Sequence, residues 1–304
     1  MLKERDRPLH CTDIKRETLF RKFEVGLQLD GTQSNYYSDK DGNDYFRVTA
    51  QTNPITGDKN SPLLNRCFVG LYPPGSTFKP LIVATGIENK IFSSPDTIDT
   101  TPFYIGKKLI GEDNRCSSQK VTPEKILVNS CNAGTARMSL QTESKLFSQM
   151  LNNLGIGRVT ASGFPGEASG TLDDNYDRWR DIRRASLSYG YGVDVTLLQL
   201  ASIYSVIANK GIKNNVSIER IEGEPISERV FSEETAKELL LMLEQVVENG
   251  VRRAKVNGYR IGGKTGTVQI YSSGYSRESH NGIFVGIAPI SEPRIVTAVI
   301  VNEP

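Results

Sequence analysis

The chain has 304 residues, of which 38% are hydrophobic and 24% are charged, and its formal net charge is +2 at pH 7. This length allows one large domain, or a domain with an appendage, around a sizeable buried core. The near balance of charge does not indicate a nucleic acid or an anionic membrane as partner. The sequence contains no apolar run of 18 residues, so it predicts no membrane span.

The N-terminal part of the chain differs in composition from the rest. Residues 1–52 are polar and contain a turn-rich stretch, which predicts weakly defined strands and loops. A series of Pro and Gly residues begins after Asn53, and we place the start of the main domain there, so that it covers 53–304. Apolar positions at helical spacing then predict helices within 73–90, 121–140, 144–155, 196–211 and 232–250.

The C-terminal part changes to the pattern of strands. Runs rich in β-branched and aromatic residues occupy 259–271, 282–289 and 294–303, and Gly, Pro and Ser separate them. Strands joined by such short connections pair antiparallel. The sequence therefore predicts an α+β fold, with an antiparallel sheet flanked by helices and a helical subdomain.

Several kinds of chemistry lack the residues they need. The two histidines are His10, in the ill-defined start, and His280, in a stretch that we expect to be a polar loop, so neither is well placed as a general base. The sequence contains no G-x-S-x-G elbow, no phosphate-binding G-x-x-x-x-G-K-[ST] loop and no H-E-x-x-H motif. A serine enzyme built from this chain would need lysine as its base.

The four cysteines, Cys11, Cys67, Cys116 and Cys131, form no C-x-x-C pair. A Cys/His zinc site is therefore not indicated, and we expect no metal. We expect the cysteines to be small buried or partly buried thiols, with Cys131 pointing into the core. Their spacing leaves a disulfide open.

Three motifs follow one another in the chain. They are S-x-x-K at Ser76–Lys79, S-x-N at Ser130–Asn132 and K-T-G at Lys264–Gly266. Each is weak alone, because the chain also has an S-x-x-K starting at Ser117 and an S-x-N starting at Ser279. Ser117 leaves little room for a core helix before Ser130, and Ser279 follows K-T-G, so only the first set occurs in a usable order.

The local sequence supports Ser76 as a nucleophile. Pro80 is tolerated only in the first turn of a helix, which places the helix start near Ser76. A serine there has a backbone N–H without an intrahelical acceptor and lies in the positive end of the helix dipole, and both stabilise an oxyanion. Lys79 follows on the same helix face. We expect burial near other cations to lower the pKa of Lys79, so that its amine can act as base.

The K-T-G motif lies on a predicted strand. Alternation places Thr265 and Thr267 on one side, and Lys264 with Gly266 on the other. Two hydroxyls and an ammonium predict a carboxylate-binding edge, and Gly266 is expected to let a ligand backbone approach. An extended peptide could pair with this strand, and the N–H of Thr267 is a candidate second oxyanion donor.

With these residues in place, the chain resembles the transpeptidase domain of class B penicillin-binding proteins, most closely the septal FtsI type. The resemblance covers about 53–304 and extends to PPGSTFKP at 73–80, FPGEASG at 164–170, SYGYG at 188–192 and GYRIGGKTGTVQ at 258–269. It implies the penicillin-binding protein or serine β-lactamase-like fold and a serine acyl-transfer enzyme without a cofactor.

The resemblance also implies roles for the motif residues. Ser76 would be acylated by the penultimate D-Ala of a peptidoglycan stem peptide, with Lys79 as activator. Ser130 would relay a proton between the two lysines, Lys79 and Lys264, and the amine that leaves or enters. Asn132 would hold the substrate amide and Lys79. Lys264, Thr265 and Thr267 would bind the terminal carboxylate, with Gly266 beside them. β-Lactams would be trapped as slowly hydrolysed acyl-enzymes, and divisome proteins would be partners at the periplasmic side of the inner membrane.

The chain also departs from the family pattern. Residues 1–52 match poorly, and we read them as a possible remnant of a linker or pedestal. We expect the membrane anchor and signal to lie outside this chain, and the family's C-terminal helix to be missing after Pro304. Two alternatives stay open: a class D-like serine β-lactamase, and a β-lactam-sensing or division scaffold domain without turnover. Glu167 is a conceivable deacylating base for the first, but its glycine-rich context predicts a turn with a solvated carboxylate.

Overall fold

The computed structural model describes two strands within 33–49 and then residues 65–111, 116, 119–173, 175–219, 221, 223–271 and 275–302. The first two strands, β1 (Gln33–Ser38) and β2 (Asp44–Thr49), pair with each other in antiparallel orientation. The helices within the described part of the chain are all too short or too polar to cross a membrane.

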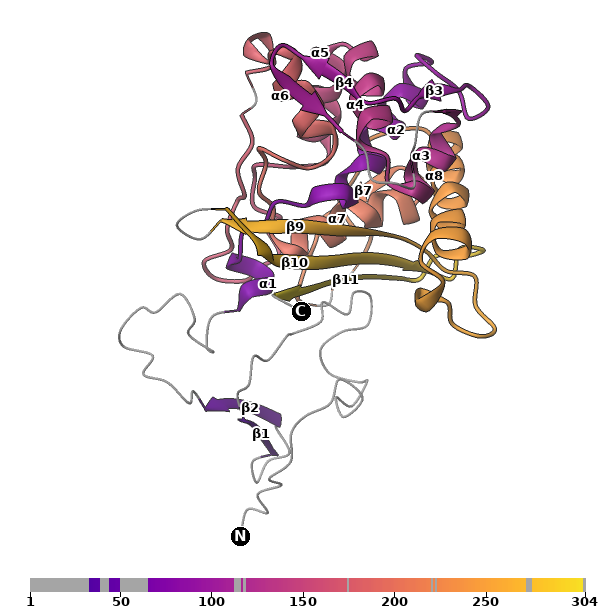
Figure 1. Ribbon diagram of the computed structural model, residues 1–304. Coiled ribbons are helices and arrows are strands. Elements are labelled where there is room, and N and C mark those ends of the chain that lie inside the picture. The colour runs from indigo at the N-terminus through magenta and orange to yellow at the C-terminus, as the bar shows by residue number, and fades with distance from the viewer. Residues whose placement is uncertain are drawn as a thin grey trace.

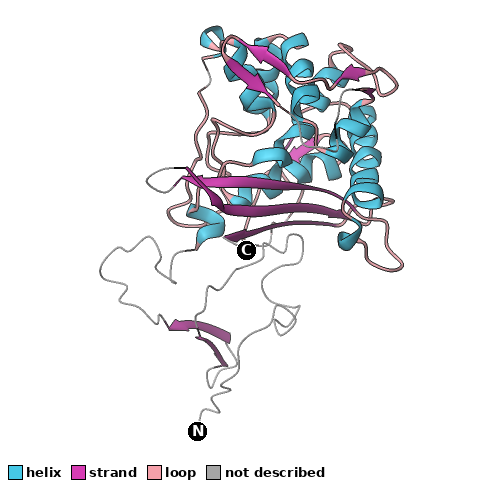
Figure 2. Ribbon diagram, viewed as in Figure 1, coloured by secondary structure: helices cyan, strands magenta, loops and turns pink. Residues whose placement is uncertain are grey.

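The main sheet consists of the three C-terminal strands. They are β9 (Gly262–Tyr271), β10 (Tyr275–Ala288) and β11 (Ile295–Asn302), in the order β11-β10-β9, and both pairings are antiparallel. Alternate residues of β10, such as Val285, are buried on the face that the helices cover. The sheet forms one layer below the helical part of the molecule (Figures 1 and 2). In the described residues β9 is therefore an edge strand.

Two long helices pack on the sheet. Helix α7 (Leu197–Ala208) contacts β10 and β11, and helix α8 (Glu233–Gln245) contacts β9. Each begins at a hydroxyl N-cap, because Thr196 accepts from the N–H of Gln199 and Ser232 from that of Thr235. Helix α7 ends at Ala208, before the end of the predicted range 196–211, and Lys210 already has a positive φ of 56°, which is outside the helical region.

A buried helix runs through the centre of the helical part. Helix α2 (Lys79–Glu88) is buried from Lys79 to Gly86 and contacts α4, α5, α6 and α8. Such complete burial requires mostly apolar residues all round, and the sequence KPLIVATGIE provides them apart from Lys79, the C-terminal Glu88 and Thr85, whose hydroxyl donates to the carbonyl of Leu81. The helices around it are α3 (Pro123–Asn129), α4 (Asn132–Gln141), α5 (Ser144–Asn153) and α6 (Asp181–Ser188).

The remaining elements are short. A short helix, α1 (Arg66–Val69), precedes the central region, and a π-helical turn (Val246–Gly250) extends α8. Three strand pairs, each two or three residues long, decorate the helical part. They are β3 (Ile98–Asp99) with β6 (Lys120–Val121), β4 (Phe103–Ile105) with β5 (Lys108–Ile110), and β7 (Ile212–Asn214) with β8 (Ser227–Arg229).

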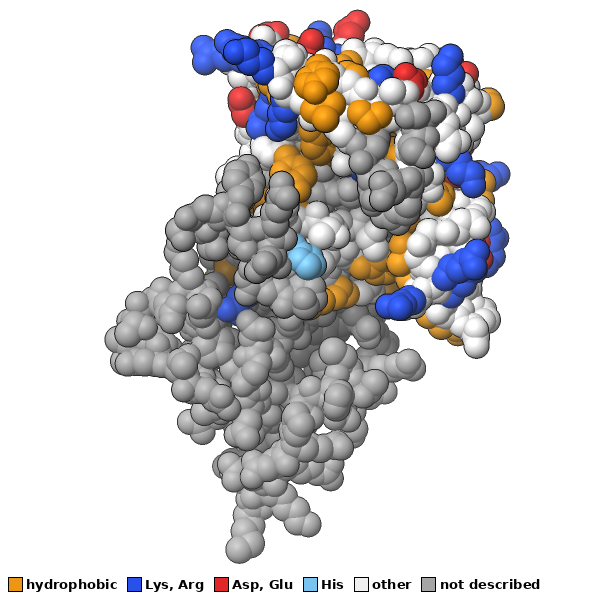
Figure 3. Space-filling model, in the orientation of Figure 1, with side chains coloured by type: hydrophobic (Ala, Val, Ile, Leu, Met, Phe, Trp, Pro, Cys, Tyr) orange, Lys and Arg blue, Asp and Glu red, His pale blue; other side chains and the backbone are white. Residues whose placement is uncertain are grey.

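The predicted fold class is confirmed: the chain is α+β, with helices on an antiparallel sheet and a helical region around α2. Lys and Arg side chains share the described part of the surface in Figure 3 with Asp and Glu, which agrees with the small net charge. One large hydrophobic core joins residues of α2, α7, α8 and the sheet. The core therefore fixes α2 relative to β9, and the two elements carry two of the three motifs.

Candidate active site

The S-x-x-K motif begins in a 3-10 turn, not in the α-helix itself. The turn η2 spans Gly75–Phe78, and α2 follows at once with Pro80 in its first turn. The backbone N–H of Lys79 donates to the carbonyl of Ser76, so these two residues are one turn apart. Ser76 is partly exposed, whereas Thr77 and Phe78 after it are fully buried. The predicted nucleophile thus lies at the accessible start of a buried helix.

Two residues from outside the motifs hold this turn in place. The backbone N–H of Gly75 donates to the carbonyl of Gly190 at 3.2 Å. The hydroxyl of Tyr204, on α7, donates to the carbonyl of Thr77 at 2.7 Å. Burial raises the pKa of Tyr204 far above its ordinary value, so this hydroxyl stays protonated as a donor. No sequence pattern pointed to Tyr204, and Gly190 was marked only as part of the SYGYG run.

Lys79 points from the central helix to the S-x-N motif. Its side chain is fully buried, and its Nζ donates to the backbone carbonyl of Ser130 and lies 3.2 Å from the Oγ of the same residue. Burial of an ammonium group is costly unless oxygen atoms surround it. The S-x-N motif supplies such oxygens, and this explains how a lysine is accommodated in an otherwise apolar helix.

Ser130 occupies the junction between two helices. It is the C-cap of α3 with φ 60° and ψ 41°, which is the left-handed region, and α4 begins two residues later at Asn132. A left-handed conformation costs a non-glycine residue about 1–2 kcal/mol. The turn directs both the carbonyl and the hydroxyl of Ser130 to Lys79. The left-handed conformation therefore occurs where the backbone places two oxygens of Ser130 against the amine of Lys79.

The K-T-G motif supplies a second ammonium group. Lys264 lies on β9, opposite Val285 of β10, and only 1% of it is exposed. Its Nζ lies 3.0 Å from the Oγ of Ser130. A serine hydroxyl can accept two hydrogen bonds and donate one. Ser130 is thus placed between the amines of Lys79 and Lys264, and this arrangement can pass a proton between them.

Burial along β9 follows the predicted alternation. Lys264 and Gly266 are buried, Thr265 is partly exposed and Thr267 is exposed. The close approach at Gly266 differs from the expected one: a Cβ there would lie 2.9 Å from the carbonyl oxygen of Pro74 and 3.5 Å from the backbone N of Ser76. Gly266 thus lets β9 pack directly on the turn η2, which contains Ser76. The three motifs, far apart in sequence, meet at one place.

Two other sequence expectations were wrong. His280 lies in β10, opposite Gln269, and not in a loop; His10 lies outside the described residues. The carboxylate of Glu167 is not simply solvated, because it accepts from the N–H of Thr160 at 2.6 Å and from the N–H and hydroxyl of Ser162 at 3.3 and 3.0 Å. Glu167 therefore stabilises the loop that contains it, through hydrogen bonds to Thr160 and Ser162.

The cysteines also differ from the expected set of thiols. Cys116 and Cys131 form a disulfide, with their Cα atoms 5.6 Å apart, and Cys131 is fully buried between Ser130 and Asn132. Cys67 is buried in α1, and Cys11 lies outside the described residues. The pairing brings Cys116 to the junction between α3 and α4, a proximity that no spacing rule predicts. Among the described residues, no group of three or more His, Cys, Asp or Glu could hold a metal ion.

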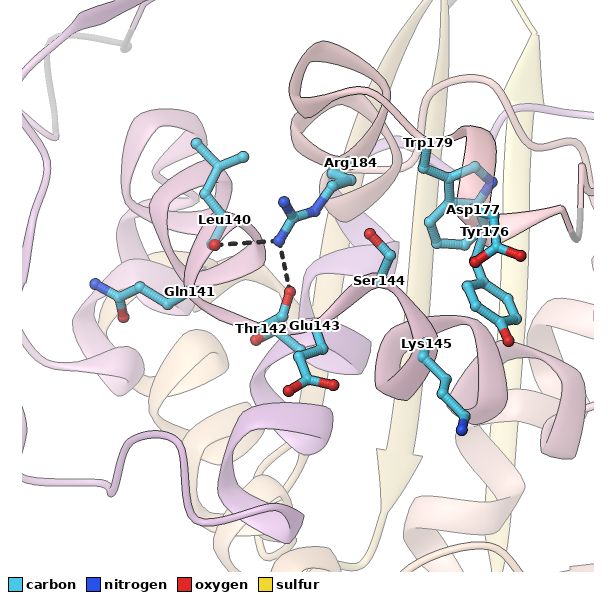
Figure 4. A pocket seen from close by; sticks show the side chains of 10 residues that line it. All are labelled: Leu140, Gln141, Thr142, Glu143, Ser144, Lys145, Tyr176, Asp177, Trp179 and Arg184. Carbon is cyan, nitrogen blue, oxygen red and sulfur yellow. Dashed lines mark hydrogen bonds between the residues drawn. The ribbon is translucent and has the colours of Figure 1, made fainter.

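A cavity of about 460 Å³ lies away from the motif residues, between α4, α5 and α6 (Figure 4). Arg184 lies at its wall and donates to the carbonyls of Ser139, Leu140 and Thr142. Ser139 and Leu140 lie in the last turn of α4 and Thr142 is its C-cap, where carbonyls lack the full set of intrahelical donors, although the N–H of Thr142 also donates to the carbonyl of Ser139. Arg184 therefore caps the C-terminal end of the helix whose first residue is Asn132, and the cavity contains none of the candidate catalytic residues.

Comparison with known proteins identifies one matching family and similar proteins described as D,D-transpeptidases. The family model for the penicillin-binding protein transpeptidase domain matches residues 34–304. The chain is 34% identical over 243 residues to the probable peptidoglycan D,D-transpeptidase PenA of Neisseria meningitidis, covering 79% of this chain and 41% of that protein. It is 33% identical over 255 residues to the peptidoglycan D,D-transpeptidase FtsI of Escherichia coli, covering 83% and 43%. The chain thus spans less than half the length of these two relatives.

Solved structures with the same fold include two penicillin-binding proteins. The transpeptidase domain of penicillin-binding protein 3 from Burkholderia pseudomallei superposes with a TM-score of 0.76 at 34% identity, over 80% of this chain and 75% of that one. Penicillin-binding protein 3 from Mycobacterium tuberculosis, complexed with aztreonam, gives a TM-score of 0.75 at 28% identity, over 83% and 61%.

Proposed function

The chain belongs to the penicillin-binding protein transpeptidase domain family, and from that premise we propose that it is the catalytic domain of a peptidoglycan D,D-transpeptidase that forms an acyl-enzyme on Ser76. One observation carries the proposal. The hydroxyl of Ser130 lies within hydrogen-bonding distance of both Lys79 and Lys264, beside the turn that presents Ser76.

The arrangement supports a division of roles in acylation. Ser76 attacks the carbonyl of the substrate, and Lys79, one turn further on, takes its proton. Ser130 passes that proton to the leaving amine, with Lys264 holding the hydroxyl in place. The backbone N–H of Ser76, at a helix start, and that of Thr267, on the adjacent strand, stabilise the oxyanion.

The edge of β9 suits an extended peptide that ends in a carboxylate. An incoming stem peptide pairs with the strand edge, and its terminal carboxylate lies near Lys264, Thr265 and Thr267. Asn132, at the start of α4, holds the substrate amide. Gly266 contributes by bringing β9 close to the turn η2.

The reaction then proceeds by two acyl transfers. Ser76 Oγ forms an ester with the penultimate D-Ala, and the peptide bond to the terminal D-Ala breaks, so that free D-Ala leaves with the relayed proton. The amine of a second stem peptide attacks this ester, forms the cross-link and returns the proton to Ser76. A β-lactam follows the first step only, because its amine remains tethered after ring opening. The ester therefore persists.

The setting of this reaction follows the relatives. We propose a septal role in cell-wall synthesis at the periplasmic side of the inner membrane, with divisome proteins as partners, supported by the 33% identity to FtsI of Escherichia coli. The disulfide between Cys116 and Cys131 fits an oxidising compartment.

The test is mass spectrometry of the intact chain after exposure to a penicillin. We expect one covalent adduct on the parent chain, mapped to Ser76, and none on Ser76→Ala. Ser117→Ala is the matched control, since it removes the serine of the second S-x-x-K motif and should leave labelling unchanged. An adduct that persists in Ser76→Ala, or no adduct on the parent, contradicts the assignment.

A second measurement separates the proposed enzyme from its alternatives. The parent chain is incubated with a D-alanyl thioester donor and a D-amino acid acceptor, and acyl transfer is followed. Transfer together with a long-lived penicillin label supports the transpeptidase. Rapid loss of the label indicates a β-lactamase, and labelling without any transfer indicates a β-lactam sensor or scaffold.

A further inference from the structure

We propose that the Cys116–Cys131 disulfide is a positioning element of the active site. It holds Ser130 between Lys79 and Lys264, so that acylation of Ser76 depends on the redox state of these two cysteines. The inference rests on the proposed function, since it concerns the rate of the same acylation.

The first step of the argument is the position of Cys131. It separates Ser130 from Asn132 and is the N-cap of α4, and none of its surface is exposed. Its backbone N–H donates to the carbonyl of Ile126 at 2.9 Å, which closes the turn at the end of α3. Any displacement of Cys131 therefore moves Ser130, the adjoining residue, with it.

The second step is the conformation that must be held. Ser130 has a left-handed backbone, which an L-residue other than glycine adopts only when its surroundings impose it. Its carbonyl and its hydroxyl both contact the Nζ of Lys79, and its hydroxyl also contacts Lys264. A relaxation of this turn would separate the oxygens of Ser130 from both amines.

The third step is the anchor at the other end of the bond. Cys116 is 2% exposed, and its carbonyl lies 2.9 Å from the hydroxyl of Thr100, which is buried. The N–H of Thr100 in turn donates to the carbonyl of Gln119 at 2.9 Å, beside the pairing of β3 with β6. The disulfide thus joins the Ser130 turn to a point that strand pairing fixes independently of the lysines.

Formation of the Cys116–Cys131 bond is balanced by the reduction of an external disulfide. Two thiols lose two hydrogen atoms as the sulfur–sulfur bond forms, and a small-molecule or protein disulfide takes them up and becomes two thiols. Reduction reverses this exchange. Both cysteines are buried, so the bond is accessible to a reductant mainly when this region opens. We therefore expect the oxidised form to persist in the folded chain.

The test compares rates of acylation by a fluorescent penicillin. Cys116→Ala removes the bond and leaves the S-x-N sequence intact, and Cys67→Ala is the matched control, since it removes a buried sulfur outside the disulfide. We expect Cys116→Ala to label to the same final stoichiometry but at least about tenfold more slowly, because a small misplacement of a catalytic group costs that much. The pH profile of its rate should also shift, while that of Cys67→Ala should match the parent.

A change in stability alone would not produce this pattern. If folded Cys116→Ala labels at the parent rate with the parent pH profile, the disulfide only stabilises the fold and the inference is wrong. If Cys116→Ala does not fold, reduction of the folded parent by a phosphine, followed as the gain of two hydrogen atoms in mass, provides the same comparison. An unchanged labelling rate in that reduced form overturns the inference. Failure of the oxidised parent to label overturns the proposed function itself, and the inference with it.

Discussion

The backbone of Gly190 lies directly against that of Gly75, the residue before Ser76. The N–H of Gly75 donates to the carbonyl of Gly190, and a Cβ at Gly190 would lie 2.2 Å from the carbonyl oxygen of Gly75. No side chain fits in this space. Because Gly190 has no side chain, the loop after α6 can lie directly against the turn η2 and hold Ser76 in position.

Substitution of Gly190 by Ala should displace that turn. We expect Gly190→Ala to slow acylation by penicillin by at least about tenfold, because the misplaced serine loses its alignment with the substrate carbonyl. Gly258→Ala is the control: Gly258 has nearly the same positive φ, 83° against 82°, and a Cβ there would meet nothing within 4 Å. Labelling kinetics at matched folded fractions make the comparison, and equal slowing in the two variants would show that backbone strain alone is responsible.

Tyr204 provides a second support for the turn, through its hydroxyl. Tyr204→Phe leaves the carbonyl of Thr77 buried without this donor, and we expect the free energy of unfolding to fall by about 1–3 kcal/mol in urea titrations. Tyr259→Phe, at a tyrosine that is 64% exposed, should be nearly neutral.

The same substitution carries a prediction about alkaline pH. Burial raises the pKa of Tyr204, so the folded state retains a proton that the unfolded state loses above a pH of about 10. The stability that Tyr204 contributes is complete below that pH and declines above it. The difference in unfolding free energy between the parent and Tyr204→Phe should therefore narrow as the pH rises past this value, and a constant difference would contradict the assignment.

Lys79 should be necessary for activity without being necessary for stability. Its amine is fully buried in α2, and burial of a polar or charged group costs more than burial of an apolar side chain of similar size at the same place. We expect Lys79→Met to reduce acylation by at least about a hundredfold, as loss of a general base does, and to leave the melting temperature unchanged or higher. Lys108→Met, at an exposed lysine, should alter neither quantity. Unfolding of Lys79→Met would contradict the prediction.

Glu88 links the end of α2 to the start of α8. Burial raises the pKa of Glu88, but hydrogen bonds from Thr235 and Ser232, with the charge of Arg229, outweigh it, and the net pKa is lowered. The stability from this lowered pKa is present above the ordinary pKa of about 4.3 and is lost as the pH falls through the lower folded value. Glu88→Gln should lower the melting temperature at neutral pH, and the difference from the parent should shrink in acid. Glu292→Gln, in an exposed ion pair, is the control.

Elements with strong local signals could be predicted from sequence. The spacing of apolar residues predicted a helix within 232–250, where α8 lies, and Pro80 indicated a helix start near Ser76. The 3-10 turn at Ser76 could not be predicted, because contacts from Gly190 and Tyr204, more than 100 residues away, help to hold it. A contact between residues that are distant in the sequence leaves no signal in the local sequence pattern.

The remaining differences have the same physical origin. The Cys116–Cys131 bond depends on the position of Cys116 beside the α3–α4 junction in the folded chain, which the spacing of the cysteines does not encode. The start of β10 was read as a polar loop, because a strand that extends beyond the core has no need of alternating apolar residues. The order of the three motifs was readable, whereas the distances of 3.2 and 3.0 Å that join them through Ser130 required the folded chain.

Because the amines of Lys79 and Lys264 meet at Ser130, an intact site also reports that the central helix and the sheet have docked correctly. Lys79 comes from the central helix and Lys264 from the sheet, so both amines reach one hydroxyl only in molecules where these layers have docked. A penicillin label that forms on Ser76 would then count correctly assembled chains. Its stoichiometry would give the usable fraction of any preparation, and compounds that loosen the docking from a distant surface could be detected by their effect on that count.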